Sequence, residues 1–102
     1  MTTANPASRP PEFGISMRLL RNAKGEARRA EELGFDYLLT GEHIMFHTGT
    51  ANNMVSLAAA AGATERIKLM SGIVLLPLYP TALLAKQAAV LDVVSDGRFH
   101  LG

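Results

Sequence analysis

Short apolar runs along the chain predict β-strands. They fall at residues 13–17, 36–40 and 67–74, and glycine, proline or polar residues separate them from the segments that follow. A fourth run begins at Phe99, close to the last residue of the sequence. We therefore expect three strands and the opening of a fourth.

The segments between these runs carry apolar residues at helical spacing, which predicts three helices over about residues 19–33, 52–61 and 81–94. Gly34 suits the end of the first helix because glycine adopts a positive φ without steric cost. Asn52 or Asn53 is expected to cap the second helix. The apolar stripes are Leu19, Leu20, Ala23, Ala27, Ala30 and Leu33; then Met54, Leu57, Ala58 and Ala61; then Leu84, Gln87, Ala88, Leu91 and Val94.

Strands that alternate with helices predict an α/β fold built from parallel βαβ units. A doubly wound sheet that binds a dinucleotide needs a glycine-rich turn after an early strand, and only Gly14 stands there. A (β/α)₈ TIM barrel places function at the carboxyl ends of its strands, where Gly41-Glu42-His43 and Ser71-Gly72 follow predicted strands. This pattern favours a partial barrel over residues 13–102, with about three βα units, the start of a fourth strand, and all helices on one face.

The two termini carry different expectations. The sequence stops inside a predicted strand, which suggests the front part of a larger barrel. Residues 1–12 contain three prolines among small polar residues and lack the apolar segment of a signal peptide. We interpret them as a disordered leader of a cytoplasmic protein.

Composition narrows the classes of function. The 102 residues are 48% hydrophobic, which suits one domain with a sizeable core. A net charge of +1 gives no electrostatic footprint for nucleic acid or an anionic membrane, and no apolar run approaches the length of a membrane span. The chain has no cysteine and no spacing of His, Asp and Glu that suggests a metal site.

Three blocks of sequence resemble the N-terminal part of the luciferase-like monooxygenases, the flavin- or deazaflavin-dependent barrel enzymes related to bacterial luciferase. The first is Ala30-Glu31-Glu32-Leu33-Gly34-Phe35-Asp36 followed by Gly41-Glu42-His43. The second runs from Thr64 to Pro77, and the third from Leu91 to Gly102. The order and spacing of the three blocks carry the resemblance over about residues 13–102.

The resemblance implies an oxidoreductase that acts on a small organic substrate. Its cofactor is either FMN, used in reduced form with oxygen, or a deazaflavin that moves hydride, and these alternatives stay open. A flavin reductase or another electron source is an implied partner, and a homo-oligomer is a further alternative. A different class of protein also fits the sequence, namely a non-catalytic βα fragment or a module that associates through open sheet edges.

The resemblance also implies two site elements. His43 is the candidate catalytic residue, since an imidazole titrates near neutral pH and exchanges protons and hydrogen bonds. Gly72, Ile73, Val74 and Leu75 are the candidate cofactor-binding residues, with a non-proline cis peptide bond expected near Ile73–Val74 to support the flavin ring. Both elements are expected at the same rim of the barrel.

Other residues near these positions have weaker functional interpretations. Glu42 is a candidate to orient a histidine or to cap a turn. His47 is interpreted as a solvated loop residue, and Tyr79 as either a packing or a pocket residue. His100 is interpreted as a buried or interface residue rather than a catalytic one.

Overall fold

The computed structural model describes residues 8–18 and 20–102. Most of the predicted leader, residues 1–7, lies outside this part of the chain, as does Leu19 of the first predicted helix. The described elements are β1 (Gly14–Ser16), the 3₁₀ helix η2 (Leu20–Asn22), α1 (Ala23–Glu32), β2 (Tyr37–Thr40), α2 (Asn53–Ala61), β3 (Lys68–Ser71), the 3₁₀ helix η3 (Leu76–Leu78), α3 (Thr81–Val94) and β4 (Phe99–His100).

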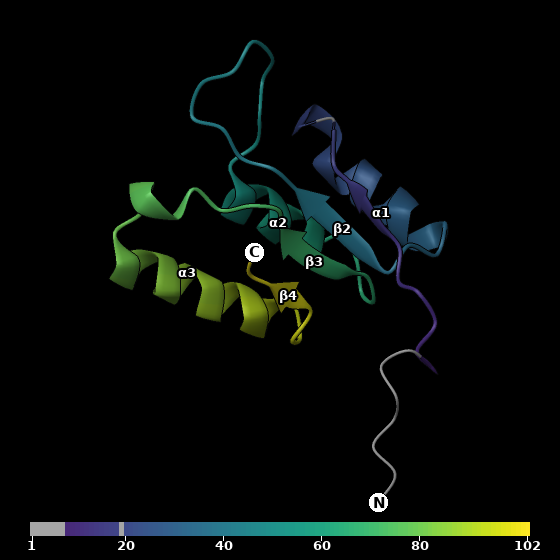
Figure 1. Ribbon diagram of the computed structural model, residues 1–102. Coiled ribbons are helices and arrows are strands. Elements are labelled where there is room, and N and C mark those ends of the chain that lie inside the picture. Colours follow the sequence, from purple (N-terminus) through teal and green to yellow (C-terminus); the bar gives the residue numbers. More distant parts are fainter. Residues whose placement is uncertain (1–7, 19) are drawn as a thin grey trace, which may run out of the picture.

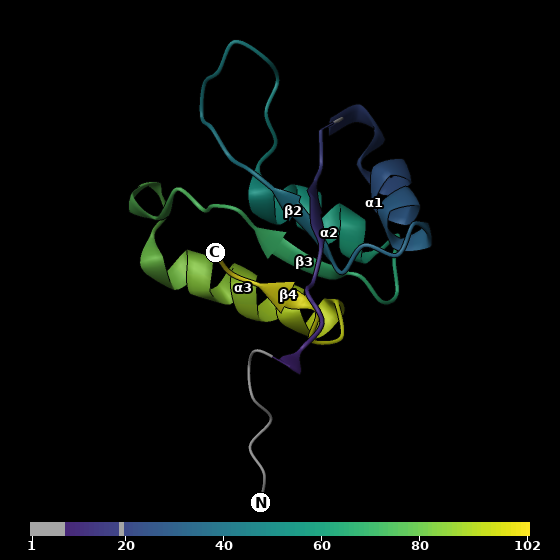
Figure 2. The same cartoon turned by 45° about the vertical axis from the view of Figure 1, so that its right-hand side comes forward.

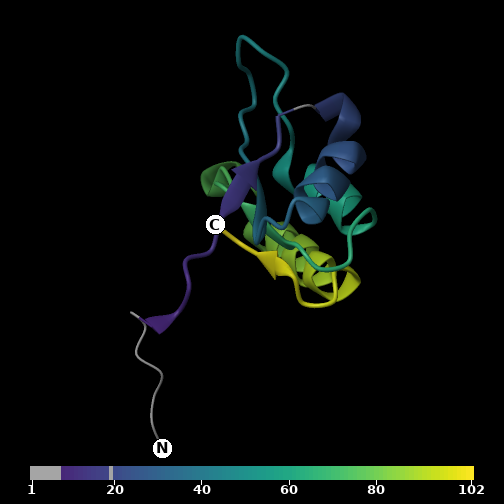
Figure 3. The same cartoon turned by 90° about the vertical axis from the view of Figure 1, so that its right-hand side faces the viewer.

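The four strands form one parallel sheet in the order β1-β2-β3-β4 (Figure 1). Helices α1, α2 and α3 all lie behind the sheet in Figure 2, and Figure 3 shows them on the same side of it. The prediction that the helices cover one face is therefore confirmed, because a doubly wound sheet would carry helices on both faces. The strand order follows the chain order, as consecutive right-handed βα units of a barrel require.

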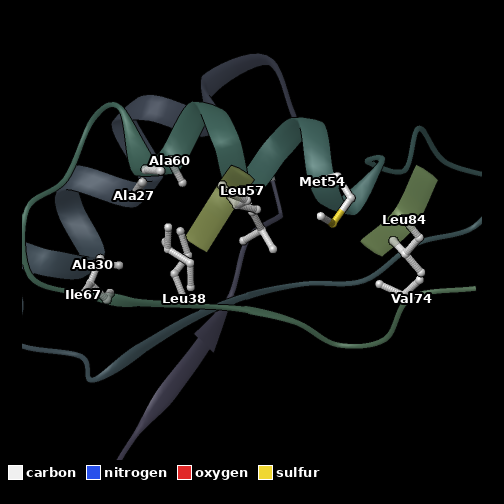
Figure 4. Close-up of a cluster of buried hydrophobic side chains, with 12 residues drawn as sticks. Ala27, Ala30, Leu38, Met54, Leu57, Ala60, Ile67, Val74 and Leu84 are labelled. Atoms are coloured by element: carbon white, nitrogen blue, oxygen red, sulfur yellow. The ribbon is translucent and has the colours of Figure 1, made fainter. Parts of the chain in front are cut away.

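The core lies between the sheet and the helices (Figure 4). Leu38 of β2 points into it from the sheet and Leu57 of α2 from the helix side. Leu69 of β3 is fully buried in the same cluster. Strand side chains alternate between faces, so the neighbours of these leucines in sequence point to the uncovered face. Small residues, Ala27, Ala30 and Ala60, let α1 and α2 approach each other closely.

Several details differ from the sequence prediction. Leu33 and Ala58 of the predicted apolar stripes are exposed, and His100, interpreted as a buried or interface residue, is exposed in this chain. The third strand was expected over residues 67–74, but β3 spans only Lys68–Ser71, and the chain leaves the ladder with β2 after a last hydrogen bond from the N–H of Gly72. Val94 was expected in the buried stripe of the third helix, but its side chain is 60% exposed while Ser95 is fully buried. At 100° per residue, Ser95 lies about 20° from the direction of Leu84 and Val94 about 80° from it, so the helix period itself explains the exchange.

An arginine holds the turns at the amino end of the sheet. Arg98 stands just before β4, and its half-buried guanidinium donates five hydrogen bonds of 2.7–3.1 Å. These bonds fix the α2–β3 connection against the turn that precedes β4. The acceptors are the carbonyl oxygens of Ser95, Ala61, Thr64 and Ile67 and the hydroxyl of Thr64.

A carboxylate performs a similar task on the neighbouring turn. Glu31 of α1 accepts hydrogen bonds from the backbone N–H groups of Glu65, Arg66 and Ile67, the shortest at 2.6 Å. Burial acts to raise the pKa of Glu31, but the three N–H groups and the Arg66 guanidinium outweigh it and lower the pKa below its ordinary value. The turn into β3 is therefore tied to α1 by an ionised group.

Candidate functional site

The carboxyl ends of β2 and β3 bring the two predicted site elements to one rim. Thr40 pairs with Ser71 in the parallel ladder, and the N–H of Gly72 donates to the carbonyl of Thr40 at 2.9 Å. His43 follows the first of these strands, and the segment from Gly72 to Leu75 follows the second. Residues that are about thirty positions apart in the sequence thus leave the sheet side by side.

The segment that follows β3 contains a non-proline cis peptide bond between Gly72 and Ile73. The sequence placed such a bond near Ile73–Val74, so the structure has it one position earlier. Ile73 is 65% exposed, whereas Val74 is buried in the core, where it lies beside Leu84 (Figure 4). Gly72 and Ile73 therefore offer surface to a ligand, and Val74 anchors the segment from below.

His43 lies in the loop between β2 and α2, which extends away from the sheet (Figure 1). Its imidazole is exposed and stacks on the ring of Phe46, with centroids 4.5 Å apart and an interplanar angle of 10°. The hydroxyl of Thr50 donates to the carbonyl of His43 at 3.1 Å, which closes the base of the loop. His47, also exposed, contacts Phe46 as well, so two histidines flank one aromatic ring.

A cavity of about 700 Å³ opens beside this loop, at the carboxyl ends of β1 and β2. His43, Thr48 and Thr50 line it from the loop, and Ser16 and Thr40 line it from the strand ends. Gly41 borders both this cavity and the β3 rim, since a Cβ built on Gly41 would lie 3.6 Å from the carbonyl oxygen of Gly72. The cavity has the size of ordinary small-molecule sites.

Glu42 occupies the centre of the rim, and its importance was underestimated from the sequence. Its side chain is buried, and the structure supports a role in capping, for its carboxylate accepts four hydrogen bonds. The sequence carries a signal for this role: an acidic residue stands two positions after a strand end, and a pair of asparagines stands at the start of the next helix. The donors are the hydroxyl of Tyr79, Asn52 Nδ2, and the backbone N–H groups of Asn53 and Leu75.

The partners of Glu42 have their own functions in the rim. Asn52 is the N-cap of α2, and its Oδ1 accepts from the N–H of Val55 at 3.1 Å. Of the two residues expected to cap this helix, Asn52 and Asn53, the structure therefore selects Asn52. Burial raises the pKa of the Tyr79 hydroxyl, and its hydrogen bond to the Glu42 carboxylate raises it further. Tyr79 therefore stays protonated and serves Glu42 as a donor.

Two classes of feature are missing from the described residues. Over residues 8–18 and 20–102, no three His, Cys, Asp or Glu side chains come together as a metal site would require. Within the same ranges, no helix is long and apolar enough to cross a membrane.

Two solved structures with this arrangement are named with FMN or coenzyme F420. The oxygenating constituent of 3,6-diketocamphane monooxygenase from Pseudomonas putida, in complex with FMN, superposes with a TM-score of 0.77 at 27% identity, over 89% of this chain and 29% of that one. The coenzyme F420-dependent tetrahydromethanopterin reductase from Methanopyrus kandleri also gives a TM-score of 0.77, at 29% identity, over 89% of this chain and 26% of the other. The sheet and its helices thus match part of a luciferase-like TIM barrel.

Sequence comparisons agree with the structural ones. The uncharacterised protein YvbT of Bacillus subtilis is 34% identical over 90 residues, which make up 87% of this chain and 27% of YvbT. The chain therefore spans between a quarter and a third of the length of these three proteins. The model of the family described as luciferase-like monooxygenase matches residues 3–102. The chain belongs to the luciferase-like monooxygenase family.

Proposed function

We propose that this chain supplies part of the active site of an oxidoreductase that uses FMN or a deazaflavin on a small organic substrate. The observation that carries the proposal is the rim at the carboxyl ends of β2 and β3, where an exposed Gly72–Ile73 surface and His43 leave neighbouring strands of a luciferase-like fold. In this fold class, the carboxyl ends of the strands are where active sites are built.

The residues at the rim fit a flavin-type ring. Gly72 lacks a side chain and the side chain of Ile73 is exposed, so together they form an apolar surface on which a planar ring can rest. Val74 and Leu75 contribute through their backbone, because Val74 is buried in the core and the N–H of Leu75 is held by Glu42. When bound, the cofactor supplies the redox chemistry, and the protein positions it and limits its contact with water.

His43 is the proposed acid–base residue. Its imidazole lines the cavity of about 700 Å³ and is exposed to it, so a substrate in the cavity can exchange a proton or a hydrogen bond with the ring. Phe46 stacks on the imidazole and limits its rotation. The residues Thr48 and Thr50 add hydroxyl groups that can orient a polar substrate.

The electron source follows from the choice of cofactor. The Pseudomonas putida relative is named as the oxygenating constituent of its enzyme and holds FMN, which supports a separate reductase that delivers reduced flavin. The Methanopyrus kandleri relative is named as an F420-dependent reductase, which supports hydride transfer without oxygen. Titration of the protein at its natural length with FMN and with F420, followed by fluorescence, separates these alternatives.

The experiment on the site uses two histidines of the same loop. His43→Ala is expected to lower oxygen consumption with reduced FMN and small organic substrates, or the corresponding F420 reaction, by roughly tenfold to a thousandfold. His47→Ala, the matched control, changes an exposed histidine of the same loop that does not line the cavity, and it is expected to leave the rate unchanged. Equal rates for wild type and His43→Ala would remove His43 from the mechanism. Failure to bind either cofactor would favour a non-catalytic module instead.

A further inference from the structure

The carboxylate of Glu42 connects three separate segments of the chain. Its Oε1 accepts from Asn52 Nδ2 at 2.9 Å and from the N–H of Asn53 at 3.4 Å, both at the start of α2, and also from the hydroxyl of Tyr79. Its Oε2 accepts from the N–H of Leu75 at 3.2 Å, in the segment that follows β3. The side chain is only 5% exposed, so water does not offer these donors an easy substitute.

A second link runs from the same network to the exposed surface of the rim. Asn53 is fully buried, and its Nδ2 donates to the carbonyl of Ile73 at 2.7 Å. Glu42 thus holds the segment after β3 twice: directly at Leu75, and through Asn53 at Ile73. Between these two points lies Val74, whose side chain is anchored in the core.

We propose that Glu42 is a positioning residue that holds the Gly72–Leu75 segment in the shape on which the cofactor ring rests. Part of this inference rests on the proposed function, since it assigns that segment to the cofactor. The action of Glu42 is indirect: it contacts the backbone behind the surface, while Gly72 and Ile73 present the surface itself.

The chemistry of the network requires a carboxylate in this place. An ionised carboxylate has two acceptor oxygens and no donor, which suits four donors that converge from different sides. In Glu42→Gln the amide has one acceptor oxygen. If that oxygen stays with Tyr79 and the two asparagines, the new NH₂ group faces the N–H of Leu75, and the direct hold on the segment is lost. The opposite amide orientation is disfavoured, because it sets the NH₂ group against two groups that can only donate, Asn52 Nδ2 and the N–H of Asn53, in place of one.

The chain offers a matched control at the opposite end of the sheet. Glu31 also uses one carboxylate to hold three backbone N–H groups of a loop, at Glu65, Arg66 and Ile67. Glu31→Gln therefore makes the same chemical change in a comparable environment, far along the strands from the proposed cofactor surface. A general loss of stability affects both variants, whereas a loss of position at the rim affects only Glu42→Gln.

The experiment measures backbone amide exchange and cofactor affinity in the protein at its natural length. In Glu42→Gln, hydrogen–deuterium exchange is expected to rise about tenfold or more at Leu75, and the dissociation constant for FMN or F420 to rise about tenfold, as for the loss of one hydrogen bond to a charged group. In Glu31→Gln, exchange is expected to rise at residues 65–67 only, with cofactor affinity within twofold of wild type.

Two results would overturn the inference. Unchanged exchange at Leu75 in Glu42→Gln would show that the carboxylate does not hold the segment. Equal cofactor affinity in the two variants would show that Glu42 stabilises the fold without shaping the site. If the wild type binds neither FMN nor F420, the proposed function fails, and the exchange at Leu75 alone decides whether Glu42 positions the segment.

Discussion

The two ends of the sheet use the same device for different purposes. At the amino end, Arg98 and Glu31 bind backbone groups of turns only a few residues long. At the carboxyl end, Glu42 binds two much longer connections, residues 41–52 and 72–80, and leaves Ile73 and the His43 loop exposed.

We infer that the amino end contributes mainly to stability and that the carboxyl end carries the proposed site. Turns whose backbone groups are bound by half-buried side chains have little freedom, which suits an end of the sheet that contributes to stability. Long connections held at a few points keep a defined shape at those points and an accessible surface between them.

The largest effect is expected from Arg98→Ala. The substitution leaves the carbonyl groups of the α2–β3 connection without their donor, so the free energy of unfolding is expected to fall by about 3 kcal/mol. Urea unfolding followed by circular dichroism measures it. Arg66→Ala is the control, because its guanidinium is 73% exposed and lies 3.9 Å from Glu31. A loss of less than about 0.5 kcal/mol is expected there.

Glu31→Gln is expected to change how stability depends on pH. Because the pKa of Glu31 is lowered in the folded state, its contribution is present above the ordinary glutamate pKa and is lost as the pH falls through the lowered value. The stability difference between wild type and variant should therefore be largest near neutral pH and shrink below about pH 4. Urea unfolding at a series of pH values measures this difference.

Glu32→Gln removes a charge from an exposed position of the same helix. It is expected to alter stability by less than about 0.5 kcal/mol. A difference between wild type and Glu31→Gln that stays constant down to pH 3 would contradict the role of the ionised carboxylate at the amino end.

Asn53→Ala is expected to have a smaller effect on stability but a second effect on the site. It removes the hydrogen bond to the carbonyl of Ile73, which costs about 1–2 kcal/mol, and should weaken cofactor binding as well. Thermal unfolding and cofactor titration measure the two effects. Asn22→Ala is the control, since the Asn22 side chain makes no capping hydrogen bond to α1. Normal cofactor affinity in Asn53→Ala would weaken the distinction between the two ends.

The smallest effect is expected at a glycine of the amino end. Gly34 follows α1 with a φ of +84°, so Gly34→Ala is expected to cost about 1 kcal/mol through backbone strain. Gly62 ends α2 with a φ of −72°, and an added Cβ would make only ordinary contacts, the nearest at 3.8 Å. Gly62→Ala should therefore be neutral or slightly stabilising. Equal melting temperatures for the two variants would contradict this account.

Much of the fold could be predicted because its signals are local. The β-prone runs and the helical spacing predicted the order of the elements, and Asn52 and Gly34 marked helix ends through their own side-chain or backbone chemistry. The one-face arrangement of the helices also followed, because right-handed crossovers in chain order leave no other face for them. The prediction failed at the end of the third helix, where Val94 was assigned to the buried stripe although the helix period places Ser95 on that face.

The candidate site also has a part that local signals predict and a part that they do not. The sequence by itself determined that polar and glycine residues follow the strand ends, and so indicated the rim to which His43 and Gly72 belong. Only the tertiary structure decided which groups meet there. The partners of Glu42 lie up to 37 residues after it in the sequence, and those of Arg98 lie up to 37 residues before it. Such contacts depend on how helices and strands pack, and the choice among many distant donors and acceptors is made by burial and geometry, which no local pattern records.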